Sequence, residues 1–133
     1  MKTDFICPKC SGHLLVGDNI ILAASTKSDK RLWLILLSPE LGNYTSIFHP
    51  EFQVEKGEKV NFFCPLCHNS LAIPDVNENL VKLIMVDKYS EKHEIIFSGI
   101  EGEECTYQIS EKEYKTYGDS SELYDAFFKT RHI

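Results

Sequence analysis

The chain has 133 residues and a net charge of −6, with 43% apolar and 26% charged residues. This balance is typical of one globular domain with a modest core. No apolar run reaches the roughly 20 residues that cross a bilayer, and the N-terminus lacks the apolar segment of a signal peptide. We therefore expect a cytoplasmic protein with no membrane partner.

The charge is unevenly distributed along the chain. Residues 1–73 carry seven basic and seven acidic side chains, whereas residues 74–133 carry seven basic and thirteen acidic ones. An acidic surface repels a phosphate backbone, and no basic cluster compensates for it. Nucleic acid is therefore not an expected partner.

Two Cys-Pro-x-Cys units, at residues 5–10 and 62–67, dominate the sequence. A shift of 57 residues aligns them, and the match continues to Val16 and Ile73. Each unit predicts a strand, a tight turn with two thiols, and a returning strand. Gly12 aligns with Asn69, and both residue types tolerate a left-handed backbone, which we expect at these positions. The repeat predicts two turns that face each other with approximate two-fold symmetry.

The region between the two units is predicted to be β. The apolar segment 31–37 has almost no polar break, so we expect a strand buried on nearly both faces. A hairpin would deliver Cys64 and Cys67 on the end of a strand. The expected strands lie at 20–24, 31–37, 44–48, 52–54 and 60–63.

The last part of the chain predicts strands followed by helix. Strands are expected at 80–86, 94–98 and 106–109. Ser110 and Glu113 have the spacing of a capping box, which predicts a short helical turn. A final helix is expected to begin at Ser120 or Ser121 and to dock on the sheet through Leu123, Tyr124, Phe127 and Phe128.

The resulting fold prediction is a single, mainly β domain of the small α+β class, covering residues 1–133. Within it, residues 1–75 would form a four-cysteine metal-binding lobe of antiparallel hairpins. Residues 76–133 would form an acidic β-hairpin lobe that ends in a short C-terminal helix.

Four cysteines, Cys7, Cys10, Cys64 and Cys67, are the candidate metal ligands. A Cys-x-x-Cys turn presents two thiolates at the separation that tetrahedral Zn²⁺ requires, and two such turns complete the shell. Four thiolates leave no position for water, which indicates a structural site. Four reduced core cysteines, or a redox dithiol, are the weaker alternatives, because the strand-then-helix context of redox dithiols is missing.

The paired units, with Leu14 and Leu71 at matching offsets, resemble the zinc ribbon and rubredoxin-like group of small β folds over roughly residues 3–75. The resemblance implies a metal bound by the four cysteines, but no particular function. Rubredoxins use the same ligands for iron and transfer single electrons. Their usual Gly after each second Cys is replaced here by Ser11 and His68, and the linker is longer. Both departures weigh against iron, which stays the alternative to zinc because the ligand type alone does not separate the two metals.

No catalytic constellation stands out in the sequence, so an enzyme is the less expected reading. Cys105 has no partner Cys and lies among acidic residues, which indicates an inert thiol. We therefore expect a zinc-binding protein-interaction or regulatory module whose partner is another protein, with a homodimer also open. The alternative is a rubredoxin-like iron electron-transfer protein.

Overall fold

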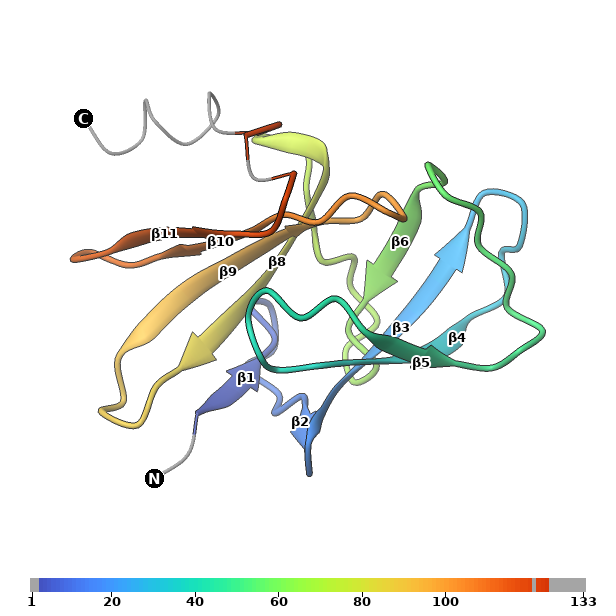
Figure 1. Ribbon diagram of the computed structural model, residues 1–133. Coiled ribbons are helices and arrows are strands. Elements are labelled where there is room, and N and C mark those ends of the chain that lie inside the picture. Colours follow the sequence, from blue (N-terminus) through green and yellow to red (C-terminus); the bar gives the residue numbers. More distant parts are fainter. Residues whose placement is uncertain (1–2, 121, 125–133) are drawn as a thin grey trace.

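A computed structural model describes residues 3–120 and 122–124 of the chain, which fold into two antiparallel β-sheets (Figure 1). These residues contain no helix, and hence none long and apolar enough to cross a membrane. The strands are β1 (Asp4–Ile6), β2 (Leu15–Val16), β3 (Asn19–Thr26), β4 (Trp33–Leu37), β5 (Ser46–Phe48), β6 (Val60–Phe63), β7 (Ala72–Ile73), β8 (Asn77–Val86), β9 (Lys92–Ser98), β10 (Thr106–Ile109) and β11 (Tyr114–Tyr117).

The two sheets enclose the main core. One has the strand order β1-β8-β9-β10-β11 with β7 also paired to β8, and the other has β2-β3-β4-β5 with β6 also paired to β3. Side chains alternate between the two faces of each strand. In β8, for example, Val81, Leu83 and Met85 point into the main core, whereas Leu80 belongs to a second cluster on the opposite face.

The two sheets are built from two halves of the chain with the same plan. Strands β1 to β5 and strands β6 to β10 make equivalent antiparallel pairings, and β11 is an addition to the second half. The first strand of each half pairs with the other half: Phe5 in β1 lies opposite Met85 in β8, and Phe62 in β6 lies opposite Ala24 in β3. The repeat therefore extends from the cysteine turns to almost the whole described chain.

The six-stranded sheet contains strands from both sides of residue 75. Strands β1 and β7 join β8 to β11 in the six-stranded sheet, although they precede residue 75 in the chain. Each cysteine turn thus connects a strand of one sheet to a strand of the other: β1 leads to β2, and β6 leads to β7.

The prediction of helix in the last part of the chain is wrong. Ser110 and Glu113 close a tight turn between β10 and β11, in which the Ser110 N–H donates to the Glu113 carbonyl oxygen at 2.9 Å. The Glu113 N–H donates to Ser110 Oγ at 3.1 Å, so the capping-box pattern here serves a hairpin. Mainly β is right, but the described chain is all-β.

The expected C-terminal helix also fails where the chain is described. Residues 122–124 form a turn, whereas Phe127 and Phe128 lie outside the described residues. Tyr124 does dock on the sheet, as the sequence predicted, because its N–H donates to Tyr107 Oη at 3.2 Å and its side chain joins the second cluster. This cluster consists of Leu80, Ile96, Cys105, Tyr107, Ile109 and Tyr124.

The expectation that residues 31–37 are buried on both faces is also wrong. The strand is shorter, Trp33–Leu37, and Leu34 is 58% exposed while Ile35 is 6% exposed. The cross-strand pairs place Leu34, Leu36, Ile47 and Ile21 together on the outer face of the five-stranded sheet. The apolar run therefore has one face in the main core and one face that no described residue covers.

Candidate metal centre

Four cysteine side chains meet where the two halves of the chain face each other. Cys7 and Cys10 lie in the turn after β1, and Cys64 and Cys67 lie in the turn after β6. The Sγ atoms of Cys7 and Cys67 are 3.8 Å apart, and so are those of Cys10 and Cys64. All four sulfur atoms lie within 4.8 Å of one another, so the predicted gathering of these residues is confirmed, and the group could hold a metal ion.

The sulfur separations fit a tetrahedral metal. A zinc–thiolate bond of about 2.3 Å gives neighbouring sulfurs a separation of about 3.8 Å at the corners of a tetrahedron. The Cys7–Cys67 and Cys10–Cys64 separations equal this value. A metal held by all four thiolates has no free coordination position, so the arrangement suits a structural or electron-transferring metal rather than one that activates water.

The two turns have the same backbone structure. The Cys7 N–H donates to the Gly12 carbonyl oxygen and the Cys64 N–H donates to that of Asn69, both at 3.0 Å. The Ser11 N–H donates to the Cys7 carbonyl oxygen and the His68 N–H donates to that of Cys64, both at 2.9 Å. The sequence repeat is therefore also a repeat of hydrogen bonds around the cysteines.

The left-handed residues of these turns differ from those expected. Ser11 (φ 61°) and His68 (φ 65°) adopt this conformation, one position before Gly12 and Asn69. Gly12 instead allows close packing, since a Cβ atom there would lie 2.5 Å from Leu66 Cδ1. Ser11 and His68 occupy the places where rubredoxins carry Gly, and this resemblance was the signal that could have located the conformation. The turn thus forms without Gly, at a cost of about 1–2 kcal/mol per residue.

Each sulfur accepts a hydrogen bond from its own turn. Such donors spread the negative charge of a thiolate and orient it toward a metal. The donors are the backbone N–H of Lys9 to Cys7 at 3.3 Å, of Gly12 to Cys10 at 3.4 Å and of Leu66 to Cys64 at 3.4 Å, and the side-chain amide of Asn69 to Cys67 at 3.5 Å.

The four thiols differ in their surroundings. Cys7 and Cys64 are fully buried in the main core, whereas Cys10 is exposed and Cys67 is half-buried. Burial raises the pKa of the Cys7 thiol to about 12. Hydrogen bonds from Asn69 lower the pKa of Cys67 to about 7. One side of the group is therefore anchored in the core and the other lies at the surface.

Cys105 lies apart from this group, in the second cluster beneath Tyr124. It is fully buried, and this burial raises the pKa of its thiol to about 11. A thiol with a raised pKa and no exposure is a poor nucleophile. This environment agrees with the inert role expected from the sequence.

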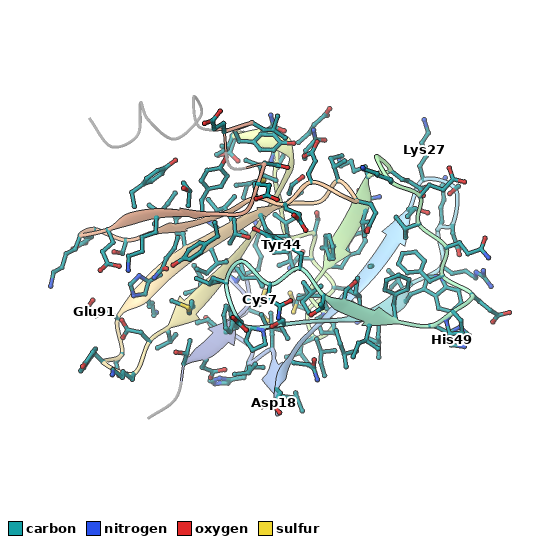
Figure 2. The ribbon with its side chains drawn as sticks, viewed as in Figure 1. Cys7, Asp18, Lys27, Tyr44, His49 and Glu91 are labelled. Carbon is teal, nitrogen blue, oxygen red and sulfur yellow. The ribbon has the colours of Figure 1, made fainter. Side chains whose placement is uncertain are left out.

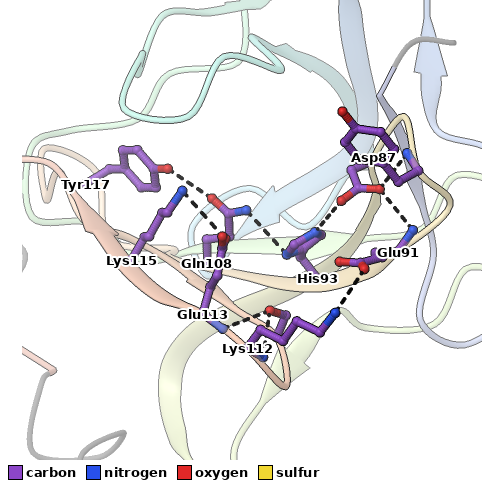
Figure 3. A network of polar contacts seen from close by, with 10 residues as sticks. Asp87, Glu91, His93, Gln108, Lys112, Glu113, Lys115 and Tyr117 are labelled. Atoms are coloured by element: carbon purple, nitrogen blue, oxygen red, sulfur yellow. Dashed lines mark hydrogen bonds and ion pairs between the residues drawn. The ribbon is translucent and has the colours of Figure 1, made fainter.

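A second group of polar side chains, which the sequence patterns did not predict, lies at the hairpin between β8 and β9 (Figure 3). Ligand atoms of Asp87, Glu91 and His93 lie within 4.8 Å of one another. His93 is only 5% exposed, and its Nε2 lies 2.9 Å from Asp87 Oδ2. Its Nδ1 faces the Gln108 amide at 3.4 Å, and Tyr117 Oη donates to Gln108 Oε1 at 2.9 Å. The contacts connect the hairpin to β10 and β11.

Asp87 holds this hairpin turn together and should make its stability sensitive to acid. The hydrogen bond from His93, with those from the Glu91 and Tyr89 N–H groups, lowers the pKa of Asp87. Since the carboxyl pKa is depressed on folding, its stabilisation is present above the ordinary value of about 3.9 and is lost as the pH falls through the folded value. We expect Asp87→Asn to lower the free energy of unfolding at pH 7, by an amount that shrinks as the pH falls below about 3.9.

The measurement is urea unfolding of the wild type and the variant between pH 2.5 and pH 7. The difference between the two proteins is the informative quantity, since metal release in acid affects both. Asp18→Asn, in the exposed turn between β2 and β3, is the control and should give no such difference. A constant difference at every pH would contradict the assignment to the Asp87 carboxylate.

Comparisons with known proteins gave no match: no family model matches the chain, and neither does any curated protein or any solved structure.

Proposed function

We propose that the chain is a small zinc-stabilised cytoplasmic protein that works by binding another protein. The four-thiolate geometry supports a structural metal with the character of a zinc ribbon. The observation that carries the binding role is the uncovered apolar outer face of the five-stranded sheet, made of Ile21, Leu34, Leu36 and Ile47. Exposed apolar patches of this kind mark interaction sites.

The repeat of the chain allows the outer face of the five-stranded sheet to be compared with that of the six-stranded sheet. By strand register, Leu36 and Ile47 occupy the places that Ile96 and Tyr107 occupy in the other sheet. Ile96 and Tyr107 are 0% exposed and belong to the second cluster together with Tyr124, whose N–H donates to Tyr107 Oη. Ile47 is 62% exposed. The described first half has no counterpart of the Tyr124 segment, so its outer face can receive a segment from outside.

The charges near this face indicate the kind of segment. The turn between β3 and β4 exposes Lys27 and Lys30, whereas its Arg31 and Asp29 neutralise each other in an ion pair at 3.0 Å. Figure 2 shows Lys27 at the far end of β3, pointing away from the sheet. We therefore assign as partner a protein segment with an aromatic or aliphatic anchor flanked by acidic residues, which would satisfy both the apolar face and these cations.

The test is partner capture with matched charge variants. The tagged wild type, Ile47→Arg and Tyr89→Arg are purified from the same cells, and stoichiometric partners are then bound again in pure form. Tyr89 is 75% exposed on the β8–β9 hairpin, so it controls for added charge on an exposed apolar residue. We expect the partner to be lost from Ile47→Arg alone, with unchanged metal content and melting temperature.

Equal capture by all three proteins would overturn the assignment of this face. Sedimentation of the purified wild type at rising concentration tests the second occupant. Self-association that Ile47→Arg abolishes would show that a second copy, and not another protein, covers the face.

A second function, electron transfer by iron, has two observations in its favour. Ser11 and His68 adopt the backbone conformation that Gly supplies in rubredoxins, and exposed Cys10 brings one ligand to the surface. Metal analysis with a visible spectrum separates the two proposals. Colourless protein with one zinc per chain supports the structural proposal, whereas coloured, redox-active protein with one iron per chain supports electron transfer.

A further inference from the structure

We propose that the cavity between the two sheets binds a small amine that carries one aromatic ring. This inference concerns a different surface from the protein-binding face and does not rest on it. The cavity has a volume of about 210 Å³ and lies between inner-face residues of both sheets. Its mouth is formed by the loop between β4 and β5 and the loop between β9 and β10.

The loop at the mouth is held in place by Tyr44. Its hydroxyl lies 2.9 Å from Thr106 Oγ1 and donates to the Tyr117 carbonyl oxygen at 3.1 Å. Figure 2 shows Tyr44 between the two sheets. These bonds connect the loop of one sheet to strands of the other, so they fix the loop at the entrance of the cavity.

The walls of the cavity suit an aromatic ring. Phe48 meets Phe52 edge-on with ring centroids 5.6 Å apart, and Phe62 meets Phe97 in the same way at 5.5 Å. All four rings line the cavity, together with Ile35 and other aliphatic side chains. A dry apolar cavity of about 150 Å³ holds benzene, so 210 Å³ accommodates a benzene ring with a chain of about two carbons. The walls offer such a ligand the edge-to-face contacts that aromatic pairs prefer.

The charge at the mouth selects the head group of the ligand. Glu40, Glu101, Glu103 and Glu104 line the cavity, and no Lys, Arg or His does so among the described residues. Glu103 is engaged, since it accepts bonds from Ser98 Oγ and Tyr124 Oη at 2.7 Å each. Glu40, Glu101 and Glu104 are exposed and can meet an ammonium group. A carboxylate would be repelled there, which is why the assignment is to an amine.

Three probes with the same apolar body test the proposal. Phenethylamine, 3-phenylpropionate and ethylbenzene carry a positive, a negative and no charge on a phenyl ring with a short chain. We expect phenethylamine to bind saturably. Binding is monitored by the chemical shifts of the backbone amides, and the changes should centre on Tyr44, Phe97 and Thr106. The affinity for 3-phenylpropionate should be at least tenfold lower, and added salt should reduce this difference.

Two variants locate the binding. Glu101→Gln combined with Glu104→Gln changes only exposed side chains, and it should remove most of the preference for the amine. Val54→Phe should fill part of the cavity and weaken all binding, whereas Val16→Phe, at an exposed position in β2, should not. Equal affinity for the three probes, absence of binding at millimolar concentration, or an unchanged preference in the double variant would each overturn the proposal. Binding by Ile47→Arg at wild-type strength would show that this site is separate from the protein-binding face.

Discussion

Cys10→Ser should release the metal and lower the melting temperature by 10 °C or more, on the order of several kcal/mol of stability. Cys10 is the exposed member of the four, so its replacement opens no hole in the core. The loss therefore reports the metal alone. The same protein should show no further change when a chelator is added, whereas the wild type with chelator should melt like the variant.

Calorimetry with metal analysis of the same samples measures this effect. Cys105→Ser is the matched control, because it removes a thiol that lies in the second cluster and not at the centre. Its melting temperature should fall modestly, owing to the burial of a hydroxyl, while its metal content stays at the wild-type level. A Cys10→Ser protein that melts like the wild type would show that the centre does not stabilise the fold.

Phe5→Ala should cost about 3–5 kcal/mol, the largest effect that we expect from a core residue. Phe5 is 0% exposed and lies in β1, the strand that the first half contributes to the sheet of the second half. Removal of its ring would enlarge the cavity between the sheets, which Phe5 lines. It would also weaken β1, the strand that leads into the first cysteine turn.

Urea unfolding at saturating zinc measures this loss. Phe62→Ala is the informative companion, since Phe62 holds the equivalent place in β6 and is 7% exposed. The two variants should lose similar amounts of free energy. Tyr89→Ala, at a 75% exposed position, should stay within about 0.5 kcal/mol of the wild type. A loss below about 1 kcal/mol for Phe5→Ala would contradict the packing described for β1.

The cysteine centre could be predicted because its ligands follow a local rule. The Cys-x-x-Cys spacing places two thiols in one turn, and the 57-residue repeat indicates that the second turn is built alike. The left-handed residue was misplaced by one position, since Gly12 and Asn69 are the residue types that tolerate this conformation best. Ser11 and His68 adopt it because the hydrogen bonds of the turn require it there.

The errors arose where one local pattern serves two structures. A Ser three residues before a Glu can cap a helix, but here the Glu113 N–H bond to Ser110 Oγ is combined with a Ser110 N–H bond to the Glu113 backbone carbonyl oxygen, which closes a hairpin. The apolar run that contains Leu34 predicts two buried faces, yet burial depends on what lies against the sheet. The contact between Asp87 and His93 needed the register of β8 and β9, which a short charged turn does not reveal.

The exchanged first strands have a consequence for how such a chain could arise. Each half alone carries two thiols, which is half of a tetrahedral shell, and its central strand lacks the neighbour that the other half supplies. A polypeptide of half this length could complete the metal shell and the sheet only by pairing with a copy of itself. Joining two copies in one gene makes that encounter intramolecular, so that metal binding no longer depends on protein concentration. After such a fusion the two outer faces are free to differ, and among the described residues of this chain Tyr124 packs on one of them while Ile47 on the other is 62% exposed.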